Sequence, residues 1–262
     1  MNPKDNQDFN AKNSSFTFNS LICACDVNGK FIVIANDKNE IEIYSTKSFD
    51  NLICYSIYSV TLHIKFHPLY YNIFSVTLGN STVCLFHIDT KTNKLQQKVK
   101  YICPNSNSII KTIFSPYTQE NYLATLSHKN IKIWNIKEYS NIYIIGIEMN
   151  YNGALSFPIK WSESGKYLVY RKAKKKIEIF SIEFNTAIYH LNYGAKDFYF
   201  LENTKQMIIL NNTSIIIFDV INEKQTSKID YLCSFNQSLI DYNNLYIYFM
   251  DDGMAKIYDI KY

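Results

Sequence analysis

Short stretches in which apolar and polar residues alternate recur along most of the chain. Successive side chains of a β-strand point to opposite faces of a sheet, so this alternation predicts half-buried strands. Six of the stretches share one form, in which the alternation ends in an aromatic residue followed by a small or polar one. They are residues 41–45, 83–88, 131–136, 177–182, 215–220 and 255–260. The pattern predicts six equivalent strands.

The strand-ending aromatic residues have a regular spacing. They are Tyr44, Phe86, Trp134, Phe180, Phe218 and Tyr258, separated by 42, 48, 46, 38 and 40 residues. A period of about 40–45 residues is that of the four-stranded blades of β-propellers. We interpret these aromatic residues as the structural signature of a repeat.

Each aromatic-ended stretch follows another β-rich run, at residues 31–35, 73–78, 122–127, 167–171, 206–211 and 245–250. Turn residues separate the two members of each pair, and a third strand ending in a turn lies farther upstream. With a variable fourth strand, this predicts an all-β propeller of six blades with four antiparallel strands each. We expect residues 15–262 to form this single domain, since about 43 residues per blade leave no length for a seventh.

One repeat resembles the WD40 family closely. It contains Phe-Ser-Pro at 114–116, Leu-Ala-Thr at 123–125 and Ile-Lys-Ile-Trp-Asn at 131–135, in the order and spacing of that family. The resemblance extends over roughly residues 15–262, although the Gly-His dipeptide of the family is absent and its turn aspartate is matched only by Asp252. It implies a divergent WD40-like propeller that most blades stabilise by apolar packing, because the Asp-His-Ser/Thr-Trp hydrogen-bond network of the family is incomplete.

The ends of the chain raise the question of how the ring closes. After residue 260 only Lys261 and Tyr262 follow, too few for a fourth strand of the last blade. We expect residues 15–18 to pair with the last blade as its missing strand. The alternative is that they extend the inner strand of the first blade, which leaves the ring open for a strand donated by a partner. Residues 1–14 are predicted to be a disordered tail.

Composition narrows the range of partners and compartments. The formal net charge is +4, and Arg171 is the only arginine, so functions that need arginine clusters are disfavoured. No apolar run reaches the roughly 20 residues of a membrane span, and the N-terminus lacks the apolar stretch of a signal peptide. The expected location is the cytoplasm or nucleus, without secretion, and the six cysteines predict no disulfide framework there.

Residues with catalytic or metal-binding chemistry are scattered. His63 and His67 are four apart on a predicted strand and turn, a spacing that places two ligands on one face of a helix and not of a strand, so we interpret them as surface or turn histidines. Cys23 and Cys25 lack a second cysteine pair and are predicted to be packed in the core. No glycine-rich phosphate loop or nucleophile elbow is present. We therefore predict no enzymatic activity, catalytic residue, metal, cofactor or small-molecule substrate.

One charged cluster is a candidate contact for an anionic partner. Its members are Arg171, Lys172, Lys174, Lys175 and Lys176, on a predicted tight turn of the fourth blade. Such a turn could contact phosphates or acidic proteins, and the alternative is a solvated loop. The Phe-Arg-Arg-Gly motif of the phosphoinositide-binding propellers is absent, which disfavours lipid binding.

The resemblance implies a non-enzymatic scaffold that mediates protein–protein interactions in a larger complex, as the small open propellers of vesicle coats and nuclear pores do. The alternative is an RNA- or ribosome-associated factor. It is based on a similarity to the propeller of eukaryotic initiation factor 2A in Leu-Ala-Thr at 123–125, Trp134, Trp-Ser-Glu at 161–163 and the lysine-rich turn. That family has a larger propeller and a charged extension, which this sequence does not match.

Overall fold

The computed structural model describes residues 20–92, 94–102, 109–116, 121–138, 140–148, 158–211, 213–230, 237–241, 246–251 and 254–259. These residues form 23 strands and no helix. The strands build five four-stranded sheets and one three-stranded sheet, in which every pair of neighbours follows directly in the chain and is antiparallel. The predicted all-β fold with a repeated four-stranded sheet is confirmed for this part of the chain.

The strands of the first three sheets have the following bounds. The first sheet contains β1 (Ile22–Val27), β2 (Phe31–Asn36), β3 (Glu40–Ser45) and β4 (Asn51–Ser56). The second contains β5 (Thr61–Phe66), β6 (Ile73–Leu78), β7 (Thr82–Asp89) and β8 (Lys94–Ile102). The third contains β9 (Ile109–Phe114), β10 (Tyr122–Ser127), β11 (Asn130–Asn135) and β12 (Ser140–Gly146).

The remaining sheets repeat this order. The fourth sheet contains β13 (Ile159–Trp161), β14 (Tyr167–Ala173), β15 (Lys176–Ser181) and β16 (Thr186–Leu191). The fifth contains β17 (Asp197–Leu201), β18 (Gln206–Leu210), β19 (Ser214–Asp219) and β20 (Lys224–Asp230). The sixth contains β21 (Gln237–Asp241), β22 (Tyr246–Asp251) and β23 (Met254–Asp259).

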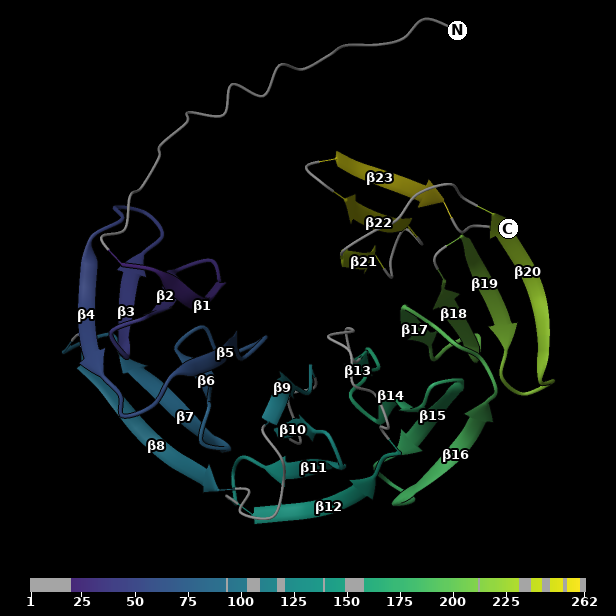
Figure 1. The fold of residues 1–262 in the computed structure, drawn as a ribbon, viewed down its shortest axis with the longest axis horizontal. Coiled ribbons are helices and arrows are strands. Elements are labelled where there is room, and N and C mark those ends of the chain that lie inside the picture. The colour runs from purple at the N-terminus through teal and green to yellow at the C-terminus, as the bar shows by residue number, and fades with distance from the viewer. Residues whose placement is uncertain are drawn as a thin grey trace, which may run out of the picture.

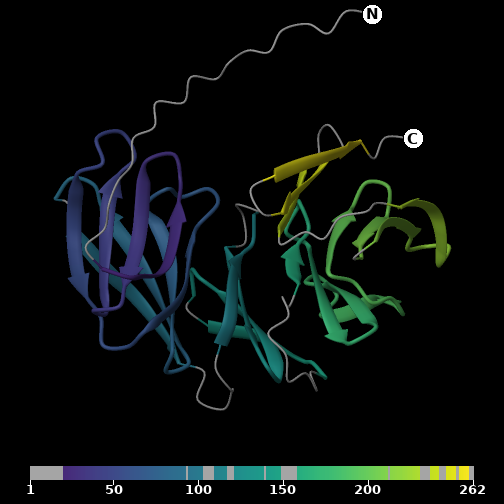
Figure 2. The same cartoon turned by 45° about the horizontal axis from the view of Figure 1, so that its top comes forward.

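The sheets follow one another around a common centre (Figure 1). The first strand of each sheet is the innermost, and the last strand of each is the outermost. The ribbons of the first and sixth sheets stand apart. The tilted view of Figure 2 shows the same sheets arranged around this centre. This radial arrangement is the one that a propeller requires.

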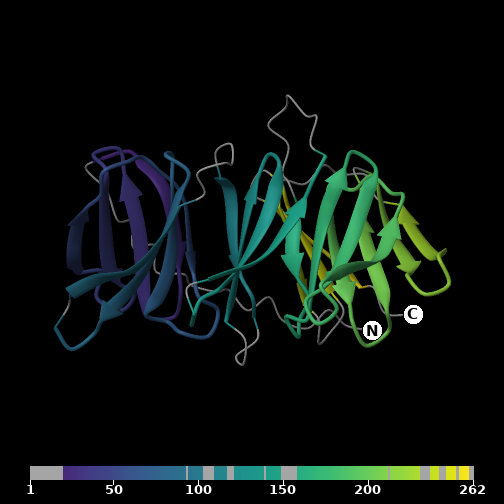
Figure 3. The same cartoon turned by 90° about the horizontal axis from the view of Figure 1, so that it is seen from below.

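Because neighbouring strands are antiparallel, the connections between them alternate between two faces of the molecule, as the side view of Figure 3 shows. We call the face at which the innermost strands begin the top face. Among the described residues, it carries the turns from the second to the third strand and the connections from the first sheet to the second and from the fourth to the fifth. The other described turns lie on the bottom face.

The predicted aromatic signature lies on the third strand of every sheet. Each aromatic residue from the second sheet onward belongs to, or packs against, an apolar cluster shared with the preceding sheet, as Phe86 does with the first sheet and Phe180 with the third. Trp134, Phe218 and Tyr258 follow the same rule. The isoleucines that alternate with them, such as Ile131 and Ile133, face the following sheet. The core is therefore a series of apolar layers between successive sheets.

Backbone register confirms that the aromatic positions are equivalent. In each of the five four-stranded sheets, the ladder between the third and fourth strands shifts by one residue at the signature aromatic. Trp134, for example, pairs with Asn141 while Ile133 pairs with Tyr143. A bulge of this kind bends the outer strand and increases its twist. The same irregularity at each repeat is evidence of one recurring unit.

The prediction that Cys23 and Cys25 are packed in the core is wrong, because both are exposed. The strand β1 belongs to the first sheet, and its Ala24 packs into the apolar cluster shared with the second sheet. Alternation along the strand therefore directs Cys25 to the opposite side, where no described strand covers it. Residues 1–14 and 15–18, to which we assigned a tail and a closing strand, lie outside the described residues.

Candidate functional site

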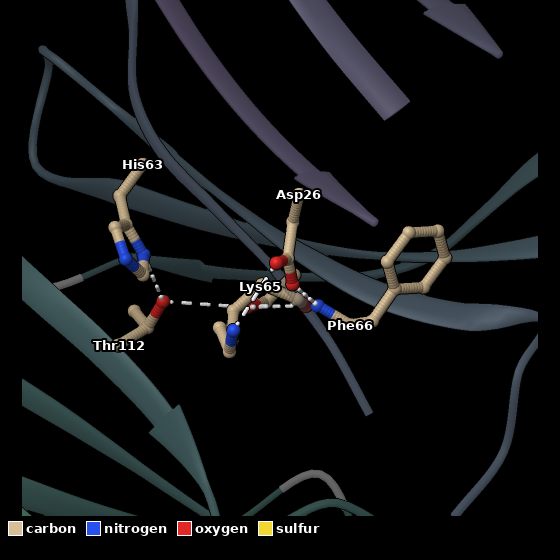
Figure 4. A network of polar contacts seen from close by, with 6 residues as sticks. Asp26, His63, Lys65, Phe66 and Thr112 are labelled. Carbon is tan, nitrogen blue, oxygen red and sulfur yellow. Dashed lines mark hydrogen bonds and ion pairs between the residues drawn. The ribbon is translucent and has the colours of Figure 1, made fainter. Parts of the chain in front are cut away.

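Polar side chains of the innermost strands join neighbouring sheets near the centre of the molecule. Asp26 of β1 accepts a hydrogen bond through Oδ2 from the backbone N–H of Phe66 at 2.7 Å, and its Oδ1 lies 3.1 Å from Nζ of Lys65 (Figure 4). The aspartate thus pairs with both the backbone and a side chain of β5. These two contacts fix the position of β1 along β5, with Asp26 beside Lys65 and Phe66.

The second and third sheets meet around Thr112 of β9, which is fully buried. Its Oγ1 lies 3.2 Å from Nδ1 of His63 (Figure 4) and 3.3 Å from the hydroxyl oxygens of both Ser75 and Thr77. Burial, assisted by the nearby charges of Lys111 and Lys65, lowers the pKa of His63 to about 4. His63 is therefore neutral near pH 7 and acts as a hydrogen-bonding group.

A third group joins the fourth, fifth and sixth sheets. Lys160 of β13 places Nζ 2.7 Å from Oδ2 of Asp197 on β17 and 3.3 Å from the ring centroid of Tyr199. The hydroxyl of Ser238 on β21 donates to the same Asp197 oxygen at 2.5 Å, and Tyr199 donates to the Ser238 carbonyl at 2.6 Å. Burial lowers the pKa of Lys160 to about 8, although Asp197 opposes this shift. These contacts hold three innermost strands together.

The chemistry of this central group is that of a structural network. Its carboxylates and hydroxyls bond to one another and to backbone groups, and these bonds join neighbouring sheets. Burial lowers the pKa of Lys111 on β9. The nearby charge of Lys65 lowers it further, and that of Asp197 opposes the shift. Among the described residues, no group of three or more His, Cys, Asp or Glu side chains could hold a metal ion.

His67 follows β5 and differs in part from its prediction as a surface or turn histidine. It does lie in the turn, where Nδ1 accepts hydrogen bonds from the N–H groups of Leu69 at 3.1 Å and Tyr70 at 3.2 Å. It is also buried, with 3% of its surface exposed, and its ring lies 4.9 Å from that of Phe114 in the third sheet. The proline after it ends the strand, and the histidine then connects the turn with the neighbouring sheet.

The lysine-rich turn is found where it was predicted, with Lys174 and Lys175 between β14 and β15. Its members have different environments. Lys172 and Lys176 place Nζ 3.1 and 3.3 Å from Oε1 of Glu178, whose side chain is 1% exposed. Lys174 and Lys175 at the tip are exposed, whereas Arg171 is partly buried on the strand. The structure therefore separates the cluster into anchored and solvent-facing charges.

Glu178 is the residue that organises this hairpin, and the sequence reasoning overlooked it. The hydroxyl of Tyr170 donates to its Oε2 at 2.6 Å, and Nδ1 of His190 lies 3.0 Å from its Oε1. Burial raises the pKa of Glu178, but the hydrogen bonds from Tyr170 and Lys172 outweigh it, so the pKa lies below its usual value. The residue was hidden because an alternating strand pattern assigns a glutamate to the solvent side.

A further surface that the sequence did not single out lies on the top face of the first two sheets. Exposed apolar side chains gather at the start of β1 and in the connection that leads into β5: Leu21, Ile22, Tyr58, Val60 and Leu62, with 75, 45, 62, 52 and 46% of their surfaces exposed. Since Asp26 lies level with Lys65 and Phe66, equal strand lengths place residues 21–23 level with residues 60–62. We call this group the apolar surface.

No protein-family model matches the chain, and no curated protein matches it. Among the described residues, no helix has the length and hydrophobicity that a membrane crossing requires.

Proposed function

We propose that the chain is a divergent WD40-like propeller of six blades that serves as a non-enzymatic scaffold and binds other proteins through its top face. The observation that carries this proposal is the apolar surface, which lies on the top face of sheets that repeat around a common centre. Scattered exposed apolar residues are ordinary in a protein, but a contiguous group is typical of an interaction site. The central polar groups are, in contrast, occupied by contacts between sheets.

The repeat itself supports the propeller. Signature aromatics from the second sheet onward contact the preceding sheet. Tyr44, the corresponding residue of the first sheet, would by the same rule face the sixth sheet. A closed ring would bring these two sheets together, and pairing of residues 15–18 with β23 would complete the last blade. In an open ring, a strand from a partner would take that place.

Variants of the apolar surface test the scaffold. The triple variant Tyr58→Ser, Val60→Ser and Leu62→Ser removes three apolar side chains from the top face. Its matched control, Leu69→Ser, Phe184→Ser and Ile221→Ser, removes three exposed apolar side chains from bottom-face turns. Tagged wild-type protein, the variant and the control are each used to purify partners from the source cells, and the captured proteins are identified by mass spectrometry.

We expect a stoichiometric partner that resists high salt, is retained by the control and is lost by the top-face variant. Capture of no stable partner by the wild type, or equal loss of the partner by both variants, contradicts the proposal.

The lysine-rich turn favours a second candidate, an RNA- or ribosome-associated factor. Its exposed lysines Lys174 and Lys175 are the side chains that would approach phosphates. This function predicts salt-sensitive co-sedimentation with ribosomes that fails when Lys172, Lys174, Lys175 and Lys176 are replaced by Glu. Co-sedimentation that is unchanged in this variant contradicts it.

A further inference from the structure

Lysine side chains gather on the top face of the third, fourth and fifth sheets. The turn between β10 and β11 contributes Lys129, the β14–β15 hairpin contributes four lysines, and the connection from β16 to β17 contributes another. We call this group the basic surface: Lys129, Lys172, Lys174, Lys175, Lys176 and Lys196. The sequence reasoning found only its central part, because the outer members are distant in the chain.

Backbone contacts show that these lysines form one surface. The carbonyl of Lys129 accepts a hydrogen bond from Ile147 at 3.0 Å, and the next residue, Glu148, donates to the carbonyl of Lys172 at 2.8 Å. On the other side of the hairpin, a Cβ placed on Gly194 would lie 3.6 Å from the Lys174 carbonyl and 3.8 Å from Cγ of Lys175. Lys196 follows two residues later. The segments that carry these lysines are therefore neighbours on three successive sheets, with the exposed Glu148 between Lys129 and Lys172.

The basic surface carries a net positive charge. Its six lysines are accompanied by three carboxylates: the exposed Glu148, the buried Glu178, and Asp197, which pairs with Lys160. Glu178 holds Lys172 and Lys176 in place from below, which limits their side-chain freedom, while Lys174 and Lys175 face solvent. Turns on the bottom face, in contrast, alternate lysines with exposed carboxylates such as Asp50, Glu183 and Glu223. Positive charge is thus concentrated on the part of the top face that the third to fifth sheets form, whereas the β2–β3 hairpin of the first sheet carries Asp37 and Glu40.

We infer that the top face binds a protein segment in which apolar side chains stand next to a run of Asp and Glu residues. This inference rests on the scaffold function and specifies the chemistry of the partner. The apolar surface would bury the apolar side chains, and the basic surface would attract the acidic run and steer its approach.

The composition of the two surfaces favours protein over RNA. Four of the five apolar side chains are aliphatic, which suits the burial of other aliphatic groups, whereas nucleobases stack on aromatic rings and arginine planes. The basic surface contains lysine only, and the single arginine of the chain, Arg171, is partly buried on β14.

Fluorescence anisotropy with defined probes tests this inference. The probes are a labelled peptide with two leucines followed by a run of glutamates, the same peptide with glutamines in place of the glutamates, and labelled oligouridine. The test variant is Lys129→Glu, Lys174→Glu and Lys175→Glu. Its matched control, Lys47→Glu, Lys91→Glu and Lys166→Glu, makes the same change in net charge at exposed positions of the bottom face.

We expect the glutamate peptide to bind the wild type and the control alike and to bind the test variant about tenfold more weakly, since three exposed attractions become repulsions. The glutamine peptide should bind the wild type more weakly than the glutamate peptide does. The inference is overturned by absent binding of the glutamate peptide, by equal weakening in both variants, or by tighter binding of oligouridine.

Purification of partners separates this inference from the function on which it rests. If the Lys→Glu test variant retains a partner that the Tyr58, Val60 and Leu62 variant loses, the scaffold function stands and the acidic partner is wrong. If neither the wild-type protein nor the bottom-face control captures a partner, the scaffold function itself fails.

Discussion

Burial changes the chemistry of single residues on the innermost strands and their turns. His67 accepts two backbone hydrogen bonds through Nδ1, and it does so only in its neutral form. Burial lowers its pKa to about 4, although a hydrogen bond with Asn121 opposes the shift. Histidine in an unfolded chain titrates near pH 6.5. The residue therefore links the stability of this turn to pH.

We predict that the free energy of unfolding falls as the pH falls from about 6.5 towards 4. In this window the unfolded chain binds a proton at His67 while the folded chain does not, so protonation favours the unfolded state, and the contribution is complete only above the unfolded pKa. The difference between the two pKa values corresponds to about 3 kcal/mol for this buried residue. Urea unfolding at a series of pH values, compared between the wild type and a His67 variant, measures this contribution apart from that of His63.

The variant His67→Asn isolates the effect, because an asparagine Oδ1 can accept from the same N–H groups but does not titrate. Its pH dependence should be shallower than that of the wild type, with the titration of His63 remaining. His128→Asn, in the turn between β10 and β11, serves as the control. A pH dependence of His67→Asn equal to that of the wild type would show that His67 is not the linked group.

At the scale of elements, the signature aromatics pack in the apolar layers between successive sheets. Phe86 on β7 is fully buried, with its ring 5.5 Å from those of both Tyr55 in the first sheet and Phe74 in its own. A bulge in β8 lies opposite it. The aromatic residue therefore connects three strands from two sheets.

We predict that Phe86→Ala destabilises the protein by about 3–5 kcal/mol, because it leaves a cavity in the apolar layer between the first two sheets. Phe86→Leu retains most of the apolar volume and should cost less, roughly 1–2 kcal/mol. His87→Ala, at the next position on the same strand, is the control for a change that leaves this layer intact. Urea midpoints of the three variants test the prediction, which fails if Phe86→Ala costs less than His87→Ala.

The strands also show which elements the sequence pattern can predict. Alternation located the second and third strands of each sheet within about two residues. It predicted half-buried strands, whereas most residues of strands such as β6 and β19 are buried, because their sheets pack between two others. The fourth strands, such as β12 and β20, carry mostly polar or exposed residues and were predicted only as a variable element. Because they lie at the outer edge, only one side of each strand packs on a neighbouring sheet, as Ile53 and Ile145 do, and the apolar pattern is weaker.

At the scale of the whole molecule, closure of the ring depends on the first and sixth sheets. Exposed Cys25 and Cys54 of the first sheet and Ile257 of the last, 60% exposed, lie on sheets that a closed ring would place side by side. If residues 15–18 complete the last blade, they join the two ends of the repeat. A strand that links the ends should then stabilise every sheet between them, because unfolding at an open end would otherwise spread inward.

We predict that deletion of residues 2–18 lowers the melting temperature by several degrees, roughly 4 °C or more, whereas deletion of residues 2–14 leaves it unchanged. Differential scanning calorimetry of the two truncated proteins and the full chain makes the comparison. Equal melting temperatures for both deletions would exclude closure by residues 15–18 and favour an open ring that a partner completes.

The sequence by itself determined the repeat, the strand order and the aromatic signature, because these depend on local alternation and on a period that recurs along the chain. Tertiary structure decided which polar residues act together. Asp26 reaches a backbone N–H forty residues away, and Glu178 lies beneath two lysines that a linear pattern shows only as a charged run. Such contacts depend on which strands become neighbours around the centre. The apolar and basic surfaces arise for the same reason, since their residues come from separate sheets and meet only when the connections between strands are brought to one face.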